Sequence, residues 1–198
     1  MTVEDYIKST CSTEGLAPLS RQIAVQLINS LPTTAIRDIS GFVNIVGGST
    51  LPYLQTDAAN ALEAAVREFG KKPRLVHALR VLPQQAAVYS WYLKHKCGIP
   101  LAAAPGTSPH ERAVSIDLND WQDWIPVLSR HDWIWRGNAD KPHFNFHGRN
   151  DPDFGHEGVR AFQTLYSKHN PSDPLTMDGV IGPHTQRALM ASSIAGWV

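Results

Sequence analysis

Two histidines and two aspartates in the second half of the chain have the residue types of a catalytic metal site. His110 ends a loop rich in proline and glycine, and Asp117 follows it on an expected strand. Asp140 and His143 stand three residues apart beyond a later turn. A catalytic zinc ion takes three protein ligands from His, Asp or Glu and keeps one position open for water. We therefore expect the two histidines and Asp117 to bind one Zn²⁺ ion, with Asp140 as the general base for the attacking water.

The same residue types also occur in proteins without any chemistry. A histidine or aspartate is usually a surface or capping residue, and nine histidines make some coincidence of spacing expected. His131 and His147 could contact the metal ligands without binding the ion themselves, or they could simply be exposed surface residues. The remaining histidines are expected at the surface: His77, His95, His156, His169 and His184. Four tryptophans are expected to form core and cleft wall rather than a stacking platform: Trp121, Trp124, Trp133 and Trp135.

Short strands and amphipathic helices must position these groups. Helical spacing of apolar residues predicts six helices, over residues 20–31, 56–69, 83–95, 121–130, 159–168 and 183–191. Strands are expected over residues 75–82, 113–118, 133–136 and 143–146, the second of them with alternating faces. A polar, turn-rich stretch over 148–154 predicts a boundary between domains 1–148 and 155–198. The fold class is therefore expected to be α+β, with a small antiparallel sheet carrying the metal, flanking helices and a helical C-terminal module. Most of the first 50 residues shows no clear pattern.

Bulk composition narrows the classes of partner. Lys plus Arg and Asp plus Glu both number 18, so no overall field points to nucleic acid or an anionic membrane. No apolar run approaches the roughly 20 residues that span a bilayer, and the first residues do not resemble a signal peptide. Cys11 and Cys97 lie outside any CxxC pattern, and free thiols are favoured over a pairing. We expect a monomer with no membrane span and no nucleic-acid partner.

Residues 104–117 resemble the signature of a zinc peptidase family. That family contains D-Ala-D-Ala carboxypeptidases and L-alanyl-D-glutamate peptidases, and its S-x-H-x-x-G-x-A-x-D motif supplies two zinc ligands. Ser108, His110 and Asp117 match the motif. Ala113 and Ser115 stand where the family has Gly and Ala, and both stay small. By this resemblance Ser108 hydrogen-bonds near the metal or the substrate, although it could also be only a turn residue that caps the loop.

Two further segments resemble the same family, in the same order along the chain. The family's second motif is an acidic residue three positions before a His and a following aromatic or apolar residue, which Asp140, His143 and Phe144 fit. Many members carry Glu as the base, where this chain has the shorter Asp. The segment from Arg80 to Gln85 is similar to the family's Y-R-S segment followed by Gln. The resemblance implies that Arg80 stabilises the developing oxyanion and that Gln85 contacts the substrate. Arg80 could instead pair with a surface carboxylate.

Residues 158–189 are similar to the small helical peptidoglycan-binding domain. Its pattern, V-x-x-Φ-Q and then D-G-Φ-Φ-G-x-x-T-x-x-A-Φ, is matched by Val159, Phe162, Gln163, Asp178, Gly179, Gly182, Thr185 and Ala188. The expected core is Val159, Phe162, Leu165, Val180, Ile181, Ala188 and Leu189. Since so short a stretch is marginal by itself, we expect it to pack against the catalytic part. An earlier helix of the usual module is either missing or supplied by the N-terminal segment. A helical tail that only closes the core is the alternative.

Together these resemblances imply a zinc metallopeptidase that hydrolyses D-amino-acid-containing stem peptides of peptidoglycan. It would act either as a D-Ala-D-Ala carboxypeptidase or as an L-Ala-D-Glu endopeptidase, which includes phage-type endolysins. The implied partner is peptidoglycan or its muropeptides, and the implied place of action is the bacterial cell wall. The alternative is a catalytically inactive peptidoglycan-binding protein on the same zinc fold.

Overall fold

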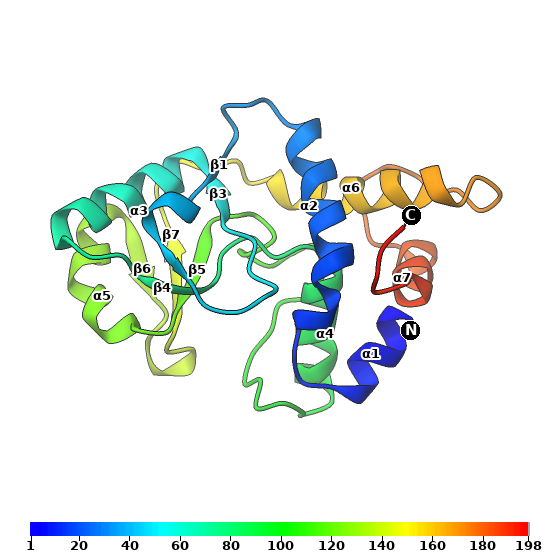
Figure 1. Ribbon diagram of the computed structural model, residues 1–198, viewed down its shortest axis with the longest axis horizontal. Helices are drawn as coiled ribbons and strands as arrows, with labels where there is room; N and C mark the ends of the chain where they lie inside the picture. Colours follow the sequence, from blue (N-terminus) through cyan, green and yellow to red (C-terminus); the bar gives the residue numbers. More distant parts are fainter. Residues whose placement is uncertain (198) are drawn as a thin grey trace.

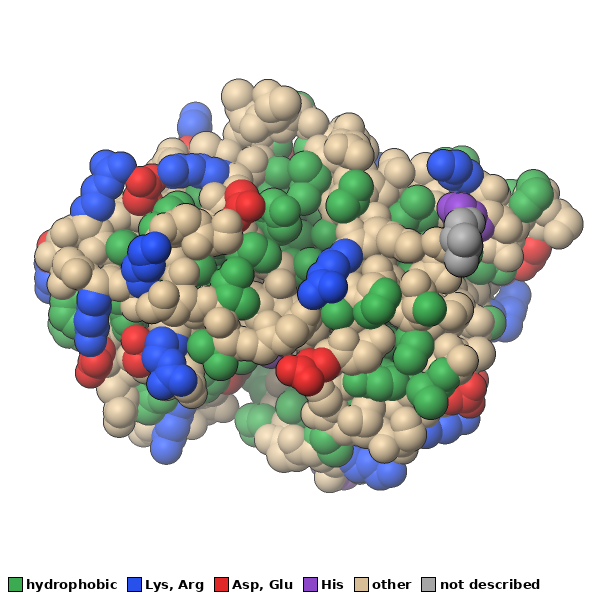
Figure 2. All heavy atoms as spheres, in the orientation of Figure 1, with side chains coloured by type: hydrophobic (Ala, Val, Ile, Leu, Met, Phe, Trp, Pro, Cys, Tyr) green, Lys and Arg blue, Asp and Glu red, His purple; other side chains and the backbone are tan. Residues whose placement is uncertain are grey.

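The structure is a computed structural model that describes residues 1–197, and it has the expected α+β class. Figure 1 shows a sheet with helices α3 and α5 on one side of the molecule and a group of helices, α1, α2, α4, α6 and α7, on the other. Both termini lie within the helical group. On the face drawn in Figure 2, side chains of both charge signs are interspersed. Among residues 1–197 no helix is long and apolar enough to cross a membrane.

Seven strands form two sheets. The main sheet has the order β2-β4-β5-β7-β6, in which β2 pairs with β4 in parallel and the other neighbours are antiparallel. Two strands form a separate antiparallel pair, β1 and β3. The bounds are β1 (Ile36–Asp38), β2 (Asn44–Ile45), β3 (Tyr53–Gln55), β4 (Arg74–His77), β5 (Ser115–Leu118), β6 (Trp133–Trp135) and β7 (His143–Phe146).

The register of the main sheet brings three polar side chains into one row. Asp117 on β5 is paired with His143 on β7 and with His77 on β4. Because residues directly opposite each other in a sheet point to the same face, these side chains start about 5 Å apart. The sheet therefore aligns two of the expected metal ligands before any loop contributes.

The other face of the main sheet packs on helices α3 (Thr56–Phe69) and α5 (Trp121–Leu128). Helix α3 has the bounds that its apolar periodicity predicts, and it ends at Gly70, which has a left-handed φ of 73°. Trp124, Trp133 and Phe144 are fully buried in this core. The alternating faces expected for the strand over 113–118 are present in β5, where Ile116 and Leu118 lie in this core and Asp117 lies on the opposite face beside His143. All four residues of β5 are buried.

A second core joins the two ends of the chain. It lies among five helices: α1 (Val3–Ser9), α2 (Ala17–Ser30), α4 (Leu82–Leu93), α6 (Phe154–His169) and α7 (Pro183–Ala191). The N-terminal helices supply Ile7, Leu19 and Ile23, which lie in one apolar cluster with Val159 and Phe162 of α6. The N-terminal segment therefore provides a packing surface for the C-terminal helices. This agrees with one of the two expected arrangements, in which the N-terminal segment supplies the earlier helix.

The matched polar positions of the C-terminal segment close a turn between α6 and α7. The Gln163 amide donates to Asp178 Oδ1 at 2.9 Å and lies 3.3 Å from Thr185 Oγ1, and its oxygen accepts the Gly179 N–H at 2.9 Å. This network holds the turn before α7 against α6. The expected core position of Val180 is wrong, since its side chain is 55% exposed at the tip of this turn.

Cys11 and Cys97 form a disulfide, so the expectation of free thiols is wrong. The two residues are 86 positions apart and are brought together because α1 packs against α4. The bond ties the segment after α1 to the segment after α4. Residues of that second segment, Ile99 to Ala103, form one wall of the cleft described below.

Several element boundaries differ from the expected ones. The strand predicted over 75–82 ends at His77, and helix α4 already begins at Leu82 because Pro83 suits a first helical turn. The helix predicted over 159–168 begins at Phe154, directly after the turn-rich stretch. The helix predicted over 121–130 ends at Leu128 and continues as a 3₁₀ turn.

Candidate metal centre

A buried carboxylate shapes the loop that carries His110. Glu111 is 4% exposed, and its Oε2 accepts the backbone N–H groups of Gly106 at 2.8 Å and Ser108 at 3.2 Å. The Ser108 hydroxyl oxygen in turn accepts the His110 N–H at 3.2 Å, while the His110 carbonyl accepts the N–H of Arg80 at 3.1 Å. These bonds fold the loop back over β5, as a seven-residue separation between His110 and Asp117 requires.

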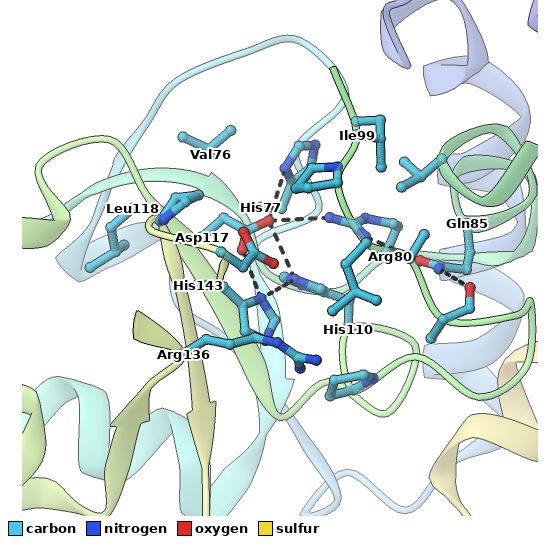
Figure 3. A pocket seen from close by; sticks show the side chains of 18 of the residues that line it. Val76, His77, Arg80, Gln85, Ile99, His110, Asp117, Leu118, Arg136 and His143 are labelled. Carbon is cyan, nitrogen blue, oxygen red and sulfur yellow. Dashed lines mark hydrogen bonds and ion pairs between the residues drawn. The ribbon is translucent and has the colours of Figure 1, made fainter. Parts of the chain in front are cut away.

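Three side chains converge at the face of the sheet. His143 Nδ1 lies 2.9 Å from Asp117 Oδ1 and 3.1 Å from His110 Nε2, and His110 Nε2 lies 3.3 Å from Asp117 Oδ2 (Figure 3). Ligand atoms bound to one zinc ion at tetrahedral angles are roughly 3.3 Å apart. The three residues are buried and can hold a metal ion. The convergence that the sequence predicts is therefore present.

Hydrogen bonds on the far side of each ring determine which nitrogen faces the site. His110 Nδ1 lies 2.8 Å from the Ala78 carbonyl, which can only accept, so Nε2 keeps its lone pair for the site. His143 Nε2 lies 2.9 Å from Asn145 Oδ1, so Nδ1 is the nitrogen of that ring that faces the site. Metal-binding histidines usually donate their other N–H in this way. Asn145 Oδ1 also accepts the Ser115 hydroxyl at 2.6 Å, so Ser115 helps to hold this acceptor in place.

The electrostatics of the three groups suit a cation. Burial lowers the pKa of His110 to about 4, so its ring is neutral at ordinary pH. Burial opposes the ionisation of Asp117, but its contacts with His110, His143 and His77 outweigh that effect and hold its pKa well below the usual range. Burial also disfavours charge on His143, yet the bonds to Asp117 and Asn145 and the charge of Asp140 raise its pKa overall. A metal ion must therefore displace a proton mainly from His143.

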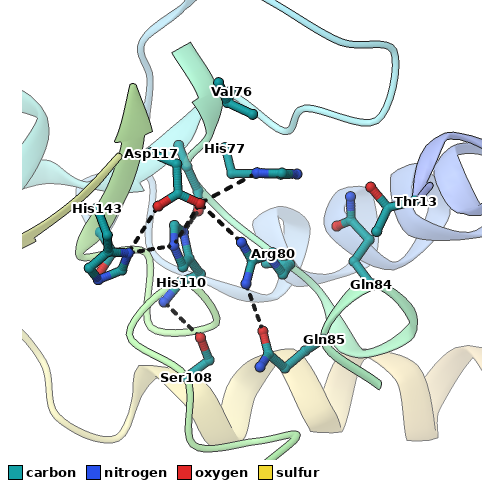
Figure 4. A network of polar contacts seen from close by, with 12 residues as sticks. Thr13, Val76, His77, Arg80, Gln84, Gln85, Ser108, His110, Asp117 and His143 are labelled. Atoms are coloured by element: carbon teal, nitrogen blue, oxygen red, sulfur yellow. Dashed lines mark hydrogen bonds and ion pairs between the residues drawn. The ribbon is translucent and has the colours of Figure 1, made fainter. Parts of the chain in front are cut away.

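Arg80 is fixed beside the same carboxylate. Its side chain is buried, with Nη2 3.2 Å from Asp117 Oδ2 and Nη1 3.1 Å from Gln85 Oε1 (Figure 4). Gln85 is held at its other end, where Nε2 donates to the Ala103 carbonyl at 2.8 Å. The alternative in which Arg80 pairs with a surface carboxylate is wrong. Gln85 is 1% exposed and faces Arg80, and Ser108 is 3% exposed and faces the backbone of His110.

The site opens into a cleft of about 620 Å³. Asp140 lines this cleft together with the three converging residues, and its side chain is half-buried. Burial raises the pKa of Asp140, as does the negative charge of Asp117. A carboxylate whose pKa is raised is a better proton acceptor than an ordinary one, so its position and its chemistry both suit the role expected for it.

The tryptophans divide as expected between core and cleft wall. Trp124 and Trp133 are buried in the core of the sheet. Trp121 lines the cleft and stacks on Trp135, with ring centroids 5.2 Å apart and an interplanar angle of 12°. Trp121 is therefore part of the cleft wall, and its ring packs against a second tryptophan.

One histidine belongs to the site although it was expected at the surface. His77 Nδ1 lies 3.4 Å from Asp117 Oδ2, and the ring lines the cleft. It does not join the group of three whose ligand atoms all lie within 4.8 Å of one another. Its position depends on the register in which β4 pairs with β5, which no local sequence pattern specifies. His131 instead contacts Glu68 at 2.7 Å and His147 is exposed, so in the described structure neither supports the site.

Comparison of the chain with models of protein families and with curated proteins finds no match. The geometry of the site therefore carries the functional argument.

Proposed function

We propose that the protein is a zinc-dependent peptidase that hydrolyses D-amino-acid-containing stem peptides of peptidoglycan. The observation that carries this proposal is the convergence of His110, Asp117 and His143 at the floor of an open cleft. A carboxylate and a buried guanidinium accompany them, from Asp140 and Arg80. A site that only stabilised the fold would need neither an open side nor these two groups.

The donor set fits zinc better than the common hard cations. Two imidazole nitrogens and one carboxylate oxygen would hold the ion, through His110 Nε2, His143 Nδ1 and Asp117. Mg²⁺ and Ca²⁺ take oxygen ligands, whereas imidazole suits zinc and its neighbours in the transition series. Three protein ligands with one open position are typical of catalytic zinc sites rather than structural ones.

The residues around the three ligands can each serve a step of peptide hydrolysis. A zinc ion bound here would act as a Lewis acid that polarises a carbonyl and lowers the pKa of a bound water. Asp140 accepts the proton of the attacking water and can return it to the leaving amine. Arg80 offers a fixed positive charge to the oxygen of the scissile carbonyl as negative charge develops on it. Gln85 keeps that guanidinium in place through its bond to Nη1.

The substrate class rests on the resemblance to wall peptidases and to the peptidoglycan-binding module. Two observations agree with it. The cleft is large enough for a short peptide rather than a single small ion or metabolite. The Cys11–Cys97 disulfide favours work outside the reducing cytosol, where the bacterial wall lies. Both a D-Ala-D-Ala carboxypeptidase and an L-Ala-D-Glu endopeptidase, including a phage-type lysin, fit these observations.

Incubation of the zinc-loaded protein with purified muropeptides, read by mass spectrometry, tests the proposal. We expect a new product whose mass identifies the bond that is cut, and no product with the Asp140→Asn variant over the same time. Elemental analysis of both proteins should show equal zinc, because Asp140 is not one of the three ligands. Bound zinc without any cleavage product would argue against a peptidase and would support the inactive peptidoglycan-binding protein.

A further inference from the structure

The cleft is lined by both apolar and cationic side chains. Its lining includes the apolar residues Val88, Ile99 and Leu101, together with Trp121 and the guanidinium of Arg136. Figure 3 shows Ile99 and Arg136 on opposite sides of the converging side chains. A peptide that crosses the metal centre would therefore meet apolar side chains as well as a cation.

Arg136 is placed next to a metal ligand by the sheet. It directly follows β6, and its N–H donates to the carbonyl of His143 at 3.0 Å. Figure 3 shows its side chain running beneath His143 toward the cleft. The side chain is exposed, and the ion pairs of residues 1–197 do not include it. All five of its N–H donors are thus available to a ligand.

Several other arginines of the molecule are already engaged in ion pairs. Arg80, on the far side of the site, is buried and bound to Asp117 and Gln85. Five arginines nearer the surface pair with carboxylates, in Arg37–Glu63, Arg67–Glu63, Arg130–Glu68, Arg149–Asp57 and Arg160–Glu157. Arg80 is therefore committed to the reacting centre, while Arg136 can recognise another part of the substrate.

The net charge of the cleft with a divalent metal ion bound also favours an anionic ligand. Its two arginines are balanced by Asp117 and Asp140, so a divalent ion leaves an excess of positive charge. Guanidinium groups bind carboxylates through two parallel N–H···O bonds. The stem peptide class proposed above offers such carboxylates, at its C-terminus and on its D-glutamyl residue.

We propose that Arg136 binds a carboxylate of the substrate close to the scissile bond, since Arg136 shares the cleft with the metal centre and its N–H bonds to the metal ligand His143. This inference rests on the proposed function. The carboxylate can be the C-terminal one, as in a carboxypeptidase substrate, or the free α-carboxylate of a D-glutamyl residue. The chemistry is the same, and the test separates the two.

The test is a double-mutant cycle in which one change is the Arg136→Gln substitution and the other is the removal of a carboxylate from the substrate. Three synthetic stem peptides are compared: one with both carboxylates, one amidated at the C-terminus and one amidated at D-glutamate. For wild type, kcat/KM should fall about 10-fold with only one of the two amides, and that one identifies the bound group. Arg136→Gln should lose about 10-fold on the parent peptide and less than about 2-fold on that amide. Arg149→Gln, an exposed arginine away from the cleft, should behave as wild type on all three.

Equal losses by Arg136→Gln on all three peptides would overturn the inference. The same cycle can be read without turnover, as Kd values for the zinc-loaded protein in an Asp140→Asn background. If wild type cleaves nothing but Arg136 still discriminates between carboxylate and amide in binding, the peptidase proposal fails while this inference stands. If the peptides are cleaved and neither readout shows discrimination, the inference fails alone.

Discussion

Replacement of Glu111 by glutamine should stabilise the protein at about pH 8 and destabilise it by about 1–2 kcal/mol at about pH 4, where Glu111 is already uncharged. Glu111 is buried, and this burial raises the pKa of its carboxyl group to about 7 because it disfavours the charged form. The N–H groups of Gly106 and Ser108 oppose that effect, and both donate to the same oxygen, Oε2. A glutamine can present one amide oxygen to both donors and never has to ionise.

The expected size follows from the difference between the folded and unfolded pKa. The unfolded chain loses this proton near 4.5, whereas the folded protein keeps it to about 7. Folded molecules thus bind more protons in this window, so stability falls as pH rises from 4.5 to 7. Each unit of difference between the folded and unfolded pKa corresponds to about 1.36 kcal/mol. The cost of ionising Glu111 above pH 7 is therefore roughly 3 kcal/mol. Because the glutamine amide N–H₂ needs an acceptor of its own, we expect a net gain of about 1–2 kcal/mol.

Urea unfolding of wild type and Glu111→Gln, followed by circular dichroism at both pH values, measures this difference. A chelator keeps both proteins free of metal, so that protons displaced by a metal ion do not contribute to the measured pH dependence of stability. Glu4→Gln on the exposed surface of α1 is the control and should change stability by less than about 0.5 kcal/mol at either pH. A Glu111→Gln variant that is less stable than wild type by the same amount at both pH values would refute the reasoning. It would mean that the carboxylate is ionised and stabilised by its backbone donors.

Three further changes have defined outcomes. Arg80→Ala should lower kcat on a cleaved muropeptide by about 10²–10³-fold with little change in KM, because it removes a charge aimed at the transition state; a rise in KM alone would assign Arg80 to substrate binding. Ser115→Ala should weaken zinc binding by up to about 10-fold in competition with a chromophoric chelator, since its hydroxyl holds the Asn145 acceptor of His143; unchanged affinity would contradict this. Replacing Cys11 and Cys97 together by serine should lower the free energy of unfolding in urea by about 2–4 kcal/mol, because the bond closes a long loop; equal stability of the two proteins would count against it.

The elements with strong local signals could be predicted from the sequence. Helix α3 has a regular apolar face and Gly70 at its end, and helix α7 begins at Pro183, so their bounds agree with the expected ones. The strand over 143–146 also agrees. The convergence of His110, Asp117 and His143 could be predicted because the segments that carry them resemble the motifs of a zinc peptidase family, whereas their spacing alone left it open.

The features that depend on distant packing could not be predicted. His77 enters the site only because β4 pairs with β5 in the register that sets it opposite Asp117, and no local pattern specifies that register. The Cys11–Cys97 bond depends on the packing of α1 against α4 across 86 positions of sequence. Helix α1 itself is short, although the bonds between Thr2 and Asp5 form a capping box that could have indicated its start.

Isothermal titration of the metal-stripped protein with Zn²⁺ tests the central claim most directly. The account predicts one ion for each wild-type chain, loss of that binding in His143→Ala and its retention in His77→Ala, which changes a neighbour outside the group of three. Wild-type protein that binds no zinc, or a His143→Ala variant that binds it as tightly as wild type, would contradict the account.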